Sequence, residues 1–193
     1  MENKTKIAVF ASGNGSNFQA IADAIQQGWL DAEIMLVVTD RPGAYVLERA
    51  KKIDTASFAF TPSDFDSKQS YEEMLKGKLQ HLGVEWIVLA GFMRLIGPVL
   101  LDAYENRIVN IHPSVLPAFP GKDAIGQTMA ARAETAGVTV HFVDAGMDTG
   151  NIIAQQSFQV NGGDRETVEN EIHAIEHRMY PATLQLLFKE TIS

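Results

Sequence analysis

Short apolar segments that favour strands alternate with segments whose apolar residues recur every three or four positions, and this alternation constrains the fold most strongly. Strands are expected at residues 6–11, 33–39, 56–60, 86–90, 108–112, 138–143 and 152–160. Helices are expected over residues 18–25, 45–52 and 123–133, from Asp66 or Ser67 to about Leu82, and after Asp164. The alternation predicts an α/β fold: a doubly wound, Rossmann-like, mostly parallel sheet with helices on both faces.

Two features of the carboxyl-terminal half modify this simple pattern. The last expected strand, residues 152–160, is a candidate for an antiparallel strand. The helix after Asp164 contains Pro181, which we expect to kink, end or restart it, because proline lacks the N–H group that a helix interior needs. The sequence shows no internal repeat, low-complexity stretch or linker, so residues 1–193 are expected to form a single domain.

Composition excludes several classes of protein. The chain has no cysteine, which excludes a disulfide framework, a thiolate zinc site and a cysteine nucleophile. Its 24 acidic and 16 basic residues give a formal net charge of −8, which disfavours nucleic acid and anionic membranes as partners. The longest strongly apolar run, residues 86–93, is far shorter than the ~20 residues that cross a bilayer. We expect a cytoplasmic monomer or homodimer that binds small molecules.

A glycine-rich turn, residues 13–17, lies between the first expected strand and the first expected helix. At this junction of an open α/β sheet, backbone amides and the helix dipole bind phosphates. Gly15 permits close approach of a ligand, and Ser16 and Asn17 add polar donors, although an ordinary tight turn with Ser16 as N-cap fits equally well. Phe18 replaces the third glycine of a dinucleotide fingerprint, which disfavours NAD and FAD, and the sequence contains no P-loop.

Three polar residues could form a catalytic group. Asn110 and His112 are two residues apart on one expected strand, so their side chains share a face near its carboxyl end. Asp148 lies between two glycines in a loop that can turn its carboxylate inward. Together, an amide donor, an imidazole and a carboxylate suit proton transfer and stabilisation of an oxyanion. Taken separately, they also fit a capping asparagine, a hydrogen-bonded histidine and a turn aspartate.

The segment from His173 to His177 matches H-x-x-E-H, the inverted zinc-peptidase motif. We nevertheless expect no metal, because only sixteen residues follow His177 and leave no distant downstream carboxylate ligand. No G-x-S-x-G motif occurs, so an α/β-hydrolase triad lacks its nucleophile signature.

In their order along the chain, the motifs resemble the phosphoribosylglycinamide formyltransferase family, folate-dependent enzymes of purine synthesis. The resemblance extends from Lys6 to about Phe188 and rests on residues 13–17, 90–94, 110–114, 116–117, 137–143 and 148–150. It implies a fold of the formyltransferase type. It also implies transfer of a formyl group from 10-formyltetrahydrofolate, as cosubstrate, to the amine of glycinamide ribonucleotide. The transfer would proceed by direct attack through a tetrahedral intermediate, without a metal.

The same resemblance implies roles for individual residues. The implied catalytic residues are Asn110, His112 and Asp148. The residues implied to bind glycinamide ribonucleotide are Gly15, Ser16, Asn17 and Glu176, which gives the H-x-x-E-H segment an explanation without metal. The residues implied to bind folate are Lys68, Met93, Arg94, Leu95, Ile96, Asn110 and Asp144. Lys68 stands where some relatives have arginine, so it keeps the charge without the bidentate fork.

Several alternatives stay open. Formyltetrahydrofolate hydrolase and the enzyme that formylates initiator methionyl-tRNA could use a similar trio, but both carry an additional domain for which 193 residues leave no room. The acidic charge also argues against tRNA. A non-catalytic folate or nucleotide binder would keep the fold without the activity. A dinucleotide oxidoreductase would use Asp40 to bind a ribose, although Asp40 is expected to be a turn residue.

Overall fold

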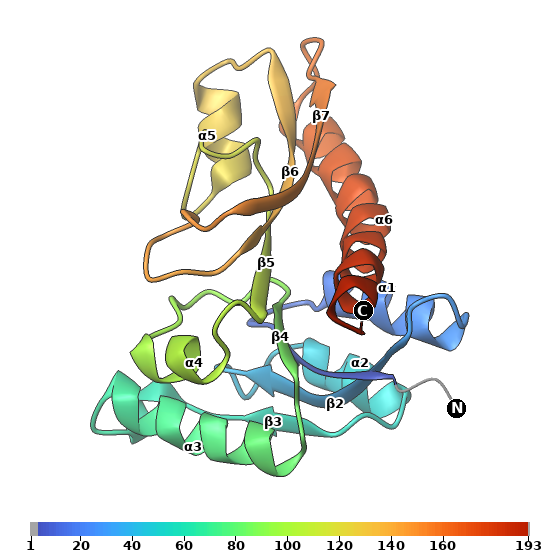
Figure 1. The fold of residues 1–193 in the computed structure, drawn as a ribbon. Coiled ribbons are helices and arrows are strands. Elements are labelled where there is room, and N and C mark those ends of the chain that lie inside the picture. Colours follow the sequence, from blue (N-terminus) through green and yellow to red (C-terminus); the bar gives the residue numbers. More distant parts are fainter. Residues whose placement is uncertain (1–3, 193) are drawn as a thin grey trace.

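The computed structural model describes residues 4–192, which form a seven-stranded sheet with the order β3-β2-β1-β4-β5-β6-β7 (Figure 1). The strands are β1 (Thr5–Phe10), β2 (Ala32–Thr39), β3 (Ser57–Ala59), β4 (Trp86–Leu89), β5 (Ile108–His112), β6 (Thr135–Phe142) and β7 (Ile152–Gln159). Strands β1 to β5 run parallel, whereas β6 is antiparallel to β5 and β7 is antiparallel to β6. The predicted mostly parallel sheet and its antiparallel last strand are confirmed, and the antiparallel direction of β6 is an additional finding.

The helices are α1 (Ser16–Gln26), α2 (Val46–Lys52), η1 (Pro62–Asp64), α3 (Lys68–His81), α4 (Pro98–Ala103), α5 (Ala124–Ala130) and α6 (Arg165–Ile192). Of the two expected caps, Ser67 caps α3 and forms a reciprocal capping box with Ser70. Helices η1 and α4 were not predicted, because elements of three and six residues are too short to show a helical period.

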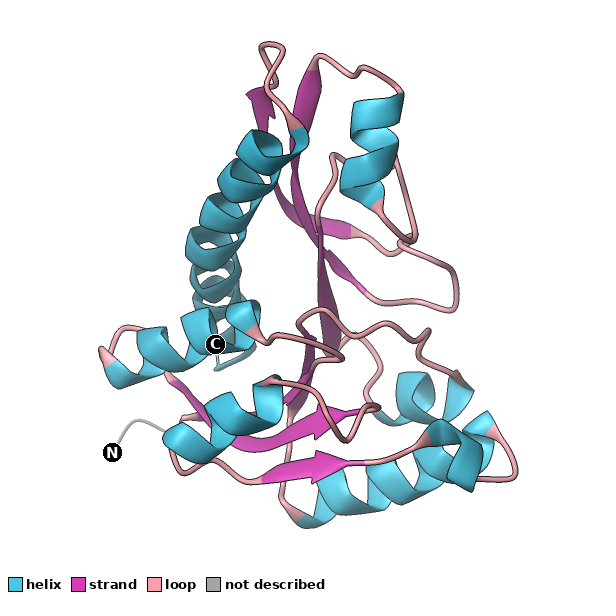
Figure 2. Ribbon diagram, turned by 180° about the vertical axis from the view of Figure 1, so that it is seen from behind, coloured by secondary structure: helices cyan, strands magenta, loops and turns pink. Residues whose placement is uncertain are grey.

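Helices cover both faces of the sheet, as the view from behind shows (Figure 2). Successive side chains of β1 point to opposite faces, so Ile7 and Val9 pack in one hydrophobic cluster and Ala8 and Phe10 in the other. The first cluster includes residues of α1, α2 and α6, and the second includes residues of α3 and α4. Burial on both faces explains why the central strands are almost continuously apolar.

Helix α6 continues through Pro181, so the expectation that this proline ends or restarts the helix is wrong. Proline removes one backbone donor, but α6 has an apolar stripe that is buried on both sides of Pro181, at Ile175, Tyr180 and Leu184. The Thr183 hydroxyl also donates to the carbonyl of Met179 across this turn (2.7 Å). Burial of the stripe against the sheet therefore outweighs the lost hydrogen bond.

The sheet reverses its winding at β1, which lies between β2 and β4. At this point the loops after β1 and β4 meet, because the backbone N–H of Ser12 donates to the carbonyl of Gly91 (3.0 Å). Open α/β sheets bind ligands beyond the carboxyl ends of their strands at such a reversal. The topology therefore places the candidate site above β1, β4 and β5.

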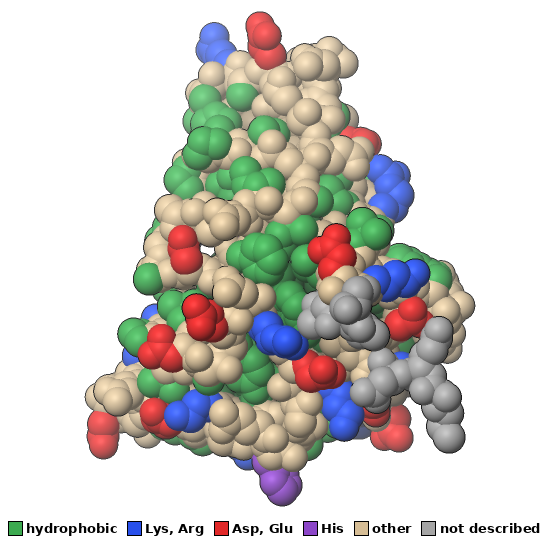
Figure 3. Space-filling view, viewed as in Figure 1, with side chains coloured by type: hydrophobic (Ala, Val, Ile, Leu, Met, Phe, Trp, Pro, Cys, Tyr) green, Lys and Arg blue, Asp and Glu red, His purple; other side chains and the backbone are tan. Residues whose placement is uncertain are grey.

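Acidic and basic side chains are interspersed on the face in Figure 3, and hydrophobic side chains gather over β6, β7 and α6. None of the helices within residues 4–192 is long and apolar enough to cross a membrane.

Candidate active site

A cleft of about 980 Å³ lies at the carboxyl ends of β1, β4 and β5. It brings together most of the residues singled out in the sequence: Gly15, Ser16, Asn17, Met93, Arg94, Leu95, Ile96, Asn110, His112, Asp144, Asp148 and Glu176. Lys68 is the exception. It lines a neighbouring hollow of about 470 Å³ that shares Met93, Arg94 and Leu95 with the cleft. The two hollows therefore adjoin along the segment 93–95.

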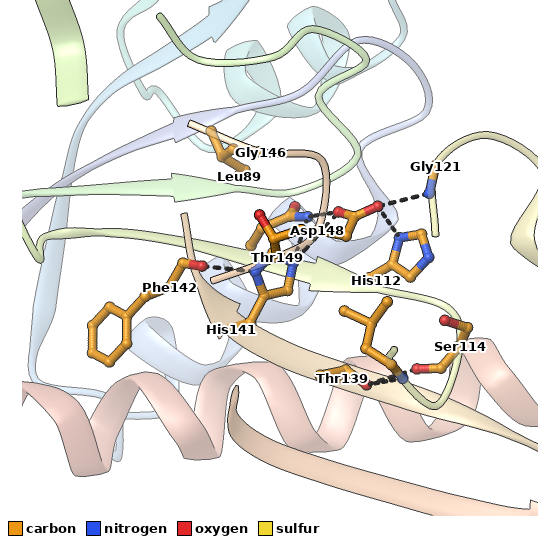
Figure 4. Close-up of polar contacts among 12 residues, drawn as sticks. Leu89, His112, Ser114, Gly121, Thr139, His141, Phe142, Gly146, Asp148 and Thr149 are labelled. Atoms are coloured by element: carbon orange, nitrogen blue, oxygen red, sulfur yellow. Dashed lines mark hydrogen bonds and ion pairs between the residues drawn. The ribbon is translucent and has the colours of Figure 1, made fainter. Parts of the chain in front are cut away.

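The carboxylate of Asp148 reaches both residues of β5 (Figure 4). Its Oδ2 lies 3.4 Å from Nδ1 of His112, and its Oδ1 lies 3.5 Å from Nδ2 of Asn110. The backbone N–H of Gly121 donates to Oδ2 at 2.8 Å. An amide, an imidazole and a carboxylate from two distant segments thus meet at one end of the cleft.

His141 is a fourth member of this group, and the sequence analysis assigned it no role. It lies on β6 opposite Asn110 in the antiparallel register, and its Nε2 is 3.3 Å from Nδ2 of Asn110 and 3.5 Å from Oδ1 of Asp148. Its ring is buried. The signal that could have found it is the pairing of β5 with β6, which the sequence alone does not reveal.

Hydrogen bonds to backbone carbonyls orient both imidazole rings. Nε2 of His112 donates to the carbonyl of Phe119 (2.9 Å), and Nδ1 of His141 donates to the carbonyl of Phe142 (2.8 Å), because a carbonyl oxygen can only accept. The remaining nitrogen of each ring faces Asp148. The carboxylate of Asp148 therefore lies within reach of both rings, 3.4 Å from Nδ1 of His112 and 3.5 Å from Nε2 of His141.

Asp148 is held in its ionised form. Burial is the largest single influence and opposes ionisation, but the hydrogen bond from His141, the amide of Gly121 and the charges of both histidines together lower the pKa of Asp148. The carboxylate is therefore available as a proton acceptor or as a counter-charge at neutral pH.

The loop that carries Asp148 has a specific shape. Asp148 adopts a left-handed conformation (φ 56°), which aspartate tolerates better than most residues. The carboxylate of Asp144 accepts hydrogen bonds from the Thr149 hydroxyl (2.6 Å) and the Gly146 amide (3.0 Å) and closes the loop on itself. A side chain at Gly150 would collide with the carbonyl of Phe142, so the loop lies directly against the end of β6.

The glycine-rich turn opens α1 at the other end of the cleft. Gly15 is the N-cap (φ 77°), so the alternative in which Ser16 caps the helix is wrong, and no described side chain caps α1. The Asn17 side chain donates to Glu176 of α6 (3.2 Å), and its own Oδ1 is buried without a hydrogen-bond partner among residues 4–192. Uncapped helix amides suit an anion, and the unpaired acceptor suits a ligand donor.

Burial raises the pKa of Glu176, while the neighbouring His173 and the hydrogen bond from Asn17 partly oppose this effect. His173 and His177 stack with ring centroids 6.2 Å apart. Within the described part of the chain, no three His, Asp or Glu side chains form a group that could hold a metal ion. The H-x-x-E-H segment contributes the buried carboxylate of Glu176 to the cleft.

The segment 93–96 forms a third side of the cleft. The side chains of Met93 and Leu95 are exposed, at 55% and 47%, whereas Ile96 is buried. The Arg94 guanidinium is paired with Asp40, with its Nε 2.8 Å from Oδ2. Asp40 is itself buried and bonded to Ser12, so it is more than the turn residue that the sequence suggests.

The chain has a ligand-sized cleft at the winding reversal of an α/β sheet, and the cleft holds an amide, an imidazole and a carboxylate. This combination is typical of enzymes that act on small molecules. The family model described as "Formyl transferase" matches residues 5–184. The chain therefore belongs to the formyl transferase family.

Individual relatives cover nearly the same length. The chain is 50% identical over 183 residues to phosphoribosylglycinamide formyltransferase of Bacillus subtilis, covering 94% of each chain. Crystal structures of phosphoribosylglycinamide formyltransferase from Bacillus halodurans and of glycinamide ribonucleotide transformylase 1 from Geobacillus kaustophilus superpose with TM-scores of 0.94 and 0.93. Their identities are 48% and 53%; the first match covers 97% of both chains, and the second covers 96% of this chain and 99% of the other.

Proposed function

We propose that this chain transfers a formyl group from 10-formyltetrahydrofolate to the amine of glycinamide ribonucleotide, a step of purine biosynthesis. Membership of the formyl transferase family supports the reaction type. The names of the relatives from Bacillus subtilis and Geobacillus kaustophilus support the nucleotide as acceptor. The single observation that carries the proposal is the meeting of Asn110, His112 and Asp148 in one cleft of about 980 Å³.

The nucleotide is proposed to occupy the end of the cleft beside α1. The amides at the uncapped start of α1, in Ser16 and Asn17, face the region where a phosphate gains most from the helix dipole. Glu176 and the unpaired Oδ1 of Asn17 can accept hydrogen bonds from sugar hydroxyls. This end therefore combines groups for both parts of a sugar phosphate.

The folate is proposed to lie along the segment 93–96. Exposed side chains at Met93 and Leu95 offer apolar contact to an aromatic ring system, and the backbone between them offers polar groups. The adjoining hollow beside Lys68 gives an extended ligand room to continue toward a cation. Asp144, in the loop at residues 144–149, also lines the cleft.

The cluster at β5 suits the chemistry of the transfer. The amine of the nucleotide attacks the formyl carbon of the bound folate and forms the new C–N bond in a tetrahedral intermediate. The bond from that carbon to the folate nitrogen then breaks, and the folate nitrogen takes up one proton for the one that the amine loses. Asn110 and a protonated His112 can donate to the formyl oxygen as negative charge develops there, a contribution of ~3 to 4 kcal/mol for each well-placed donor. Asp148 stabilises the imidazolium and can receive the proton that the amine loses, directly or through a water.

An absorbance assay tests the proposal. The chain is incubated with 10-formyl-5,8-dideazafolate, with and without glycinamide ribonucleotide. Release of the deformylated folate only when the nucleotide is present is the expected result. Release without the nucleotide would identify a hydrolase instead, and silence in both, with tight binding of the folate, would identify a binding protein.

We also propose that residues 1–193 act as a single domain on small molecules in the cytoplasm, as a monomer or homodimer. The net charge of −8 supports small-molecule substrates over nucleic acid. Sedimentation at several protein concentrations distinguishes the two assembly states.

A further inference from the structure

Two carboxylates in the core beside the cleft have no part in the proposed chemistry. Asp40 is 5% exposed and follows β2, and Glu72 is 1% exposed and lies on α3. Buried carboxylates are costly unless they are bonded, so each must have a structural partner that repays its burial. The partners of both residues lie on the same segment of chain, at its two ends.

Asp40 holds the first end of this segment. Its Oδ1 accepts from the Ser12 hydroxyl (2.6 Å), and the Ser12 oxygen in turn accepts from the backbone N–H of Met93 (2.9 Å). Its Oδ2 accepts from Nε of Arg94 (2.8 Å). The backbone N–H of Ser12 also donates to the carbonyl of Gly91 (3.0 Å). Hydrogen bonds at Gly91, Met93 and Arg94 therefore tie this stretch to the residues that follow β1 and β2.

Glu72 holds the second end. Its Oε1 accepts from the backbone N–H of Gly97 (2.5 Å), and its Oε2 accepts from the N–H of Leu100 (3.4 Å). Gly97 is the N-cap of α4 and carries no side chain that could cap the helix, so a residue of α3 does this instead. A side chain at Gly97 would lie 2.8 Å from Oε2 of Glu72. The close approach therefore depends on glycine.

Between these two ends, Ile96 packs into the hydrophobic core, while the residues before it are largely exposed. Met93 and Leu95 are about half exposed, and the side chain of Arg94 is 41% exposed. Tyr71 of α3 lines the neighbouring hollow together with Met93, Arg94 and Leu95. Burial raises the pKa of its hydroxyl, Glu72 and Asp40 add to this effect, and Arg94 opposes it. The anchors thus belong to one connected region under the segment.

We propose that Asp40, acting through Ser12 and Arg94, and Glu72, acting through Gly97, are positioning residues that fix the backbone of residues 93–96 in the conformation that receives the folate. Glu72 does not line the cleft, and although Asp40 does, Ser12 and Arg94 each donate to one of its two carboxylate oxygens. The physical reason is preorganisation: a segment that is already ordered pays less conformational entropy when it binds. The inference rests on the proposed function, because it is the folate whose binding it explains.

Three substitutions loosen the anchors. Ser12→Ala removes the acceptor of the Met93 amide, Asp40→Asn removes the charge that pairs with Arg94, and Glu72→Gln places an amide NH₂ against a backbone donor. We expect each to raise the KM for the folate about tenfold, equivalent to about 1.4 kcal/mol. The KM for the nucleotide should stay within about twofold.

Matched controls separate this effect from a general loss of charge. Glu73→Gln alters the neighbouring residue of α3, whose carboxylate is exposed and pairs with Lys76. Asp54→Asn alters an exposed aspartate in a left-handed conformation that asparagine also accepts. Both controls should keep the wild-type KM for each substrate.

Hydrogen exchange of the ligand-free chain provides a readout that does not depend on activity. The amides of residues 91–97 should exchange about tenfold faster in Ser12→Ala and Glu72→Gln than in wild type and in Glu73→Gln. Should Glu72→Gln not fold, Ser12→Ala and Asp40→Asn carry the same test.

Each result has one meaning. Unchanged exchange in residues 91–97 together with an unchanged folate KM in the folded variants would overturn the positioning role. An equal rise in both KM values would overturn it as well, because that pattern indicates general damage to the cleft. Failure of the proposed function is seen separately, in the wild-type chain, as no transfer in the presence of both substrates.

Discussion

Replacing Asp148 by asparagine tests the charge of the catalytic cluster while it preserves the shape. Asparagine tolerates the left-handed conformation at this position (φ 56°), and its oxygen can still accept from the Gly121 amide. The change therefore removes the negative charge beside His112 and His141 and little else. We expect the variant to fold and to bind both substrates.

The magnitude follows from the distances. A full charge on Asp148 lies 3.4 Å from Nδ1 of His112, and at an effective dielectric constant of ~20 this pair is worth at most about 5 kcal/mol. Proton transfer by a positioned group accounts for about 10² to 10⁴ in rate. We therefore expect kcat to fall by between about 10² and 10⁴, with KM values within about threefold of wild type.

The assay is the absorbance change on transfer from 10-formyl-5,8-dideazafolate at saturating nucleotide. Asp102→Asn, an exposed substitution on α4, is the control and should keep the wild-type kcat. A folded Asp148→Asn variant with kcat within tenfold of wild type would refute the assignment, because the charge would then be dispensable for the transfer.

Three further predictions concern the other parts of the cleft. Burial raises the pKa of Glu176, so ionisation of this carboxyl above its ordinary pKa lowers the stability of the folded wild type. Glu176→Gln should therefore have a higher melting temperature than wild type, and the difference in melting temperature should widen from pH 5 to pH 8. The same variant should have a higher KM for the nucleotide. Gly15→Ala should lose about 1–3 kcal/mol in urea unfolding, because its Cβ would lie 2.6 Å from Val46 in a left-handed conformation, and Gly13→Ala, which meets no atom within 4 Å, should lose less; equal losses would contradict this account. Burial lowers the pKa of His177, so wild type should lose stability as the pH falls below about 6.5, and His177→Gln should lose less between pH 7 and pH 5.5; parallel pH profiles would show that this ring is not the cause.

The order of elements could be predicted because it depends on residues close together in the chain. The strand at Ile108–His112 matches its expected bounds, since a short run of β-branched residues ends at a proline that no central strand can include. The same local geometry places Asn110 and His112 on one face. Of the three effects expected of Pro181, ending or restarting the helix is wrong, because burial against the sheet, far away in sequence, stabilises α6 through this position.

The sequence predicted the kinds of side chain in the candidate site, but it did not identify all of the residues that form it. Asp148 was singled out because it lies between two glycines, and the resemblance to known enzymes implied its catalytic role. Its approach to β5 depends on the loop that Gly150 allows to lie against Phe142. His141 was missed, since it reaches the cluster through the pairing of two antiparallel strands. Asp40 was expected to be a turn residue, because its buried partners come from separate loops.

Patterns along the chain were sufficient to indicate a sheet covered by helices, a turn suited to bind a phosphate, and a set of polar side chains near strand ends. Hydrophobic periodicity, turn residues and motif spacing all reflect interactions between residues close together in the chain. The folded molecule alone establishes which of those side chains meet, in which direction burial and neighbouring groups shift the pKa of Asp148, and how the exposed segment beside them is held. Those properties depend on burial and on contacts between segments as much as 159 residues apart, such as Asn17 with Glu176, which no local pattern encodes.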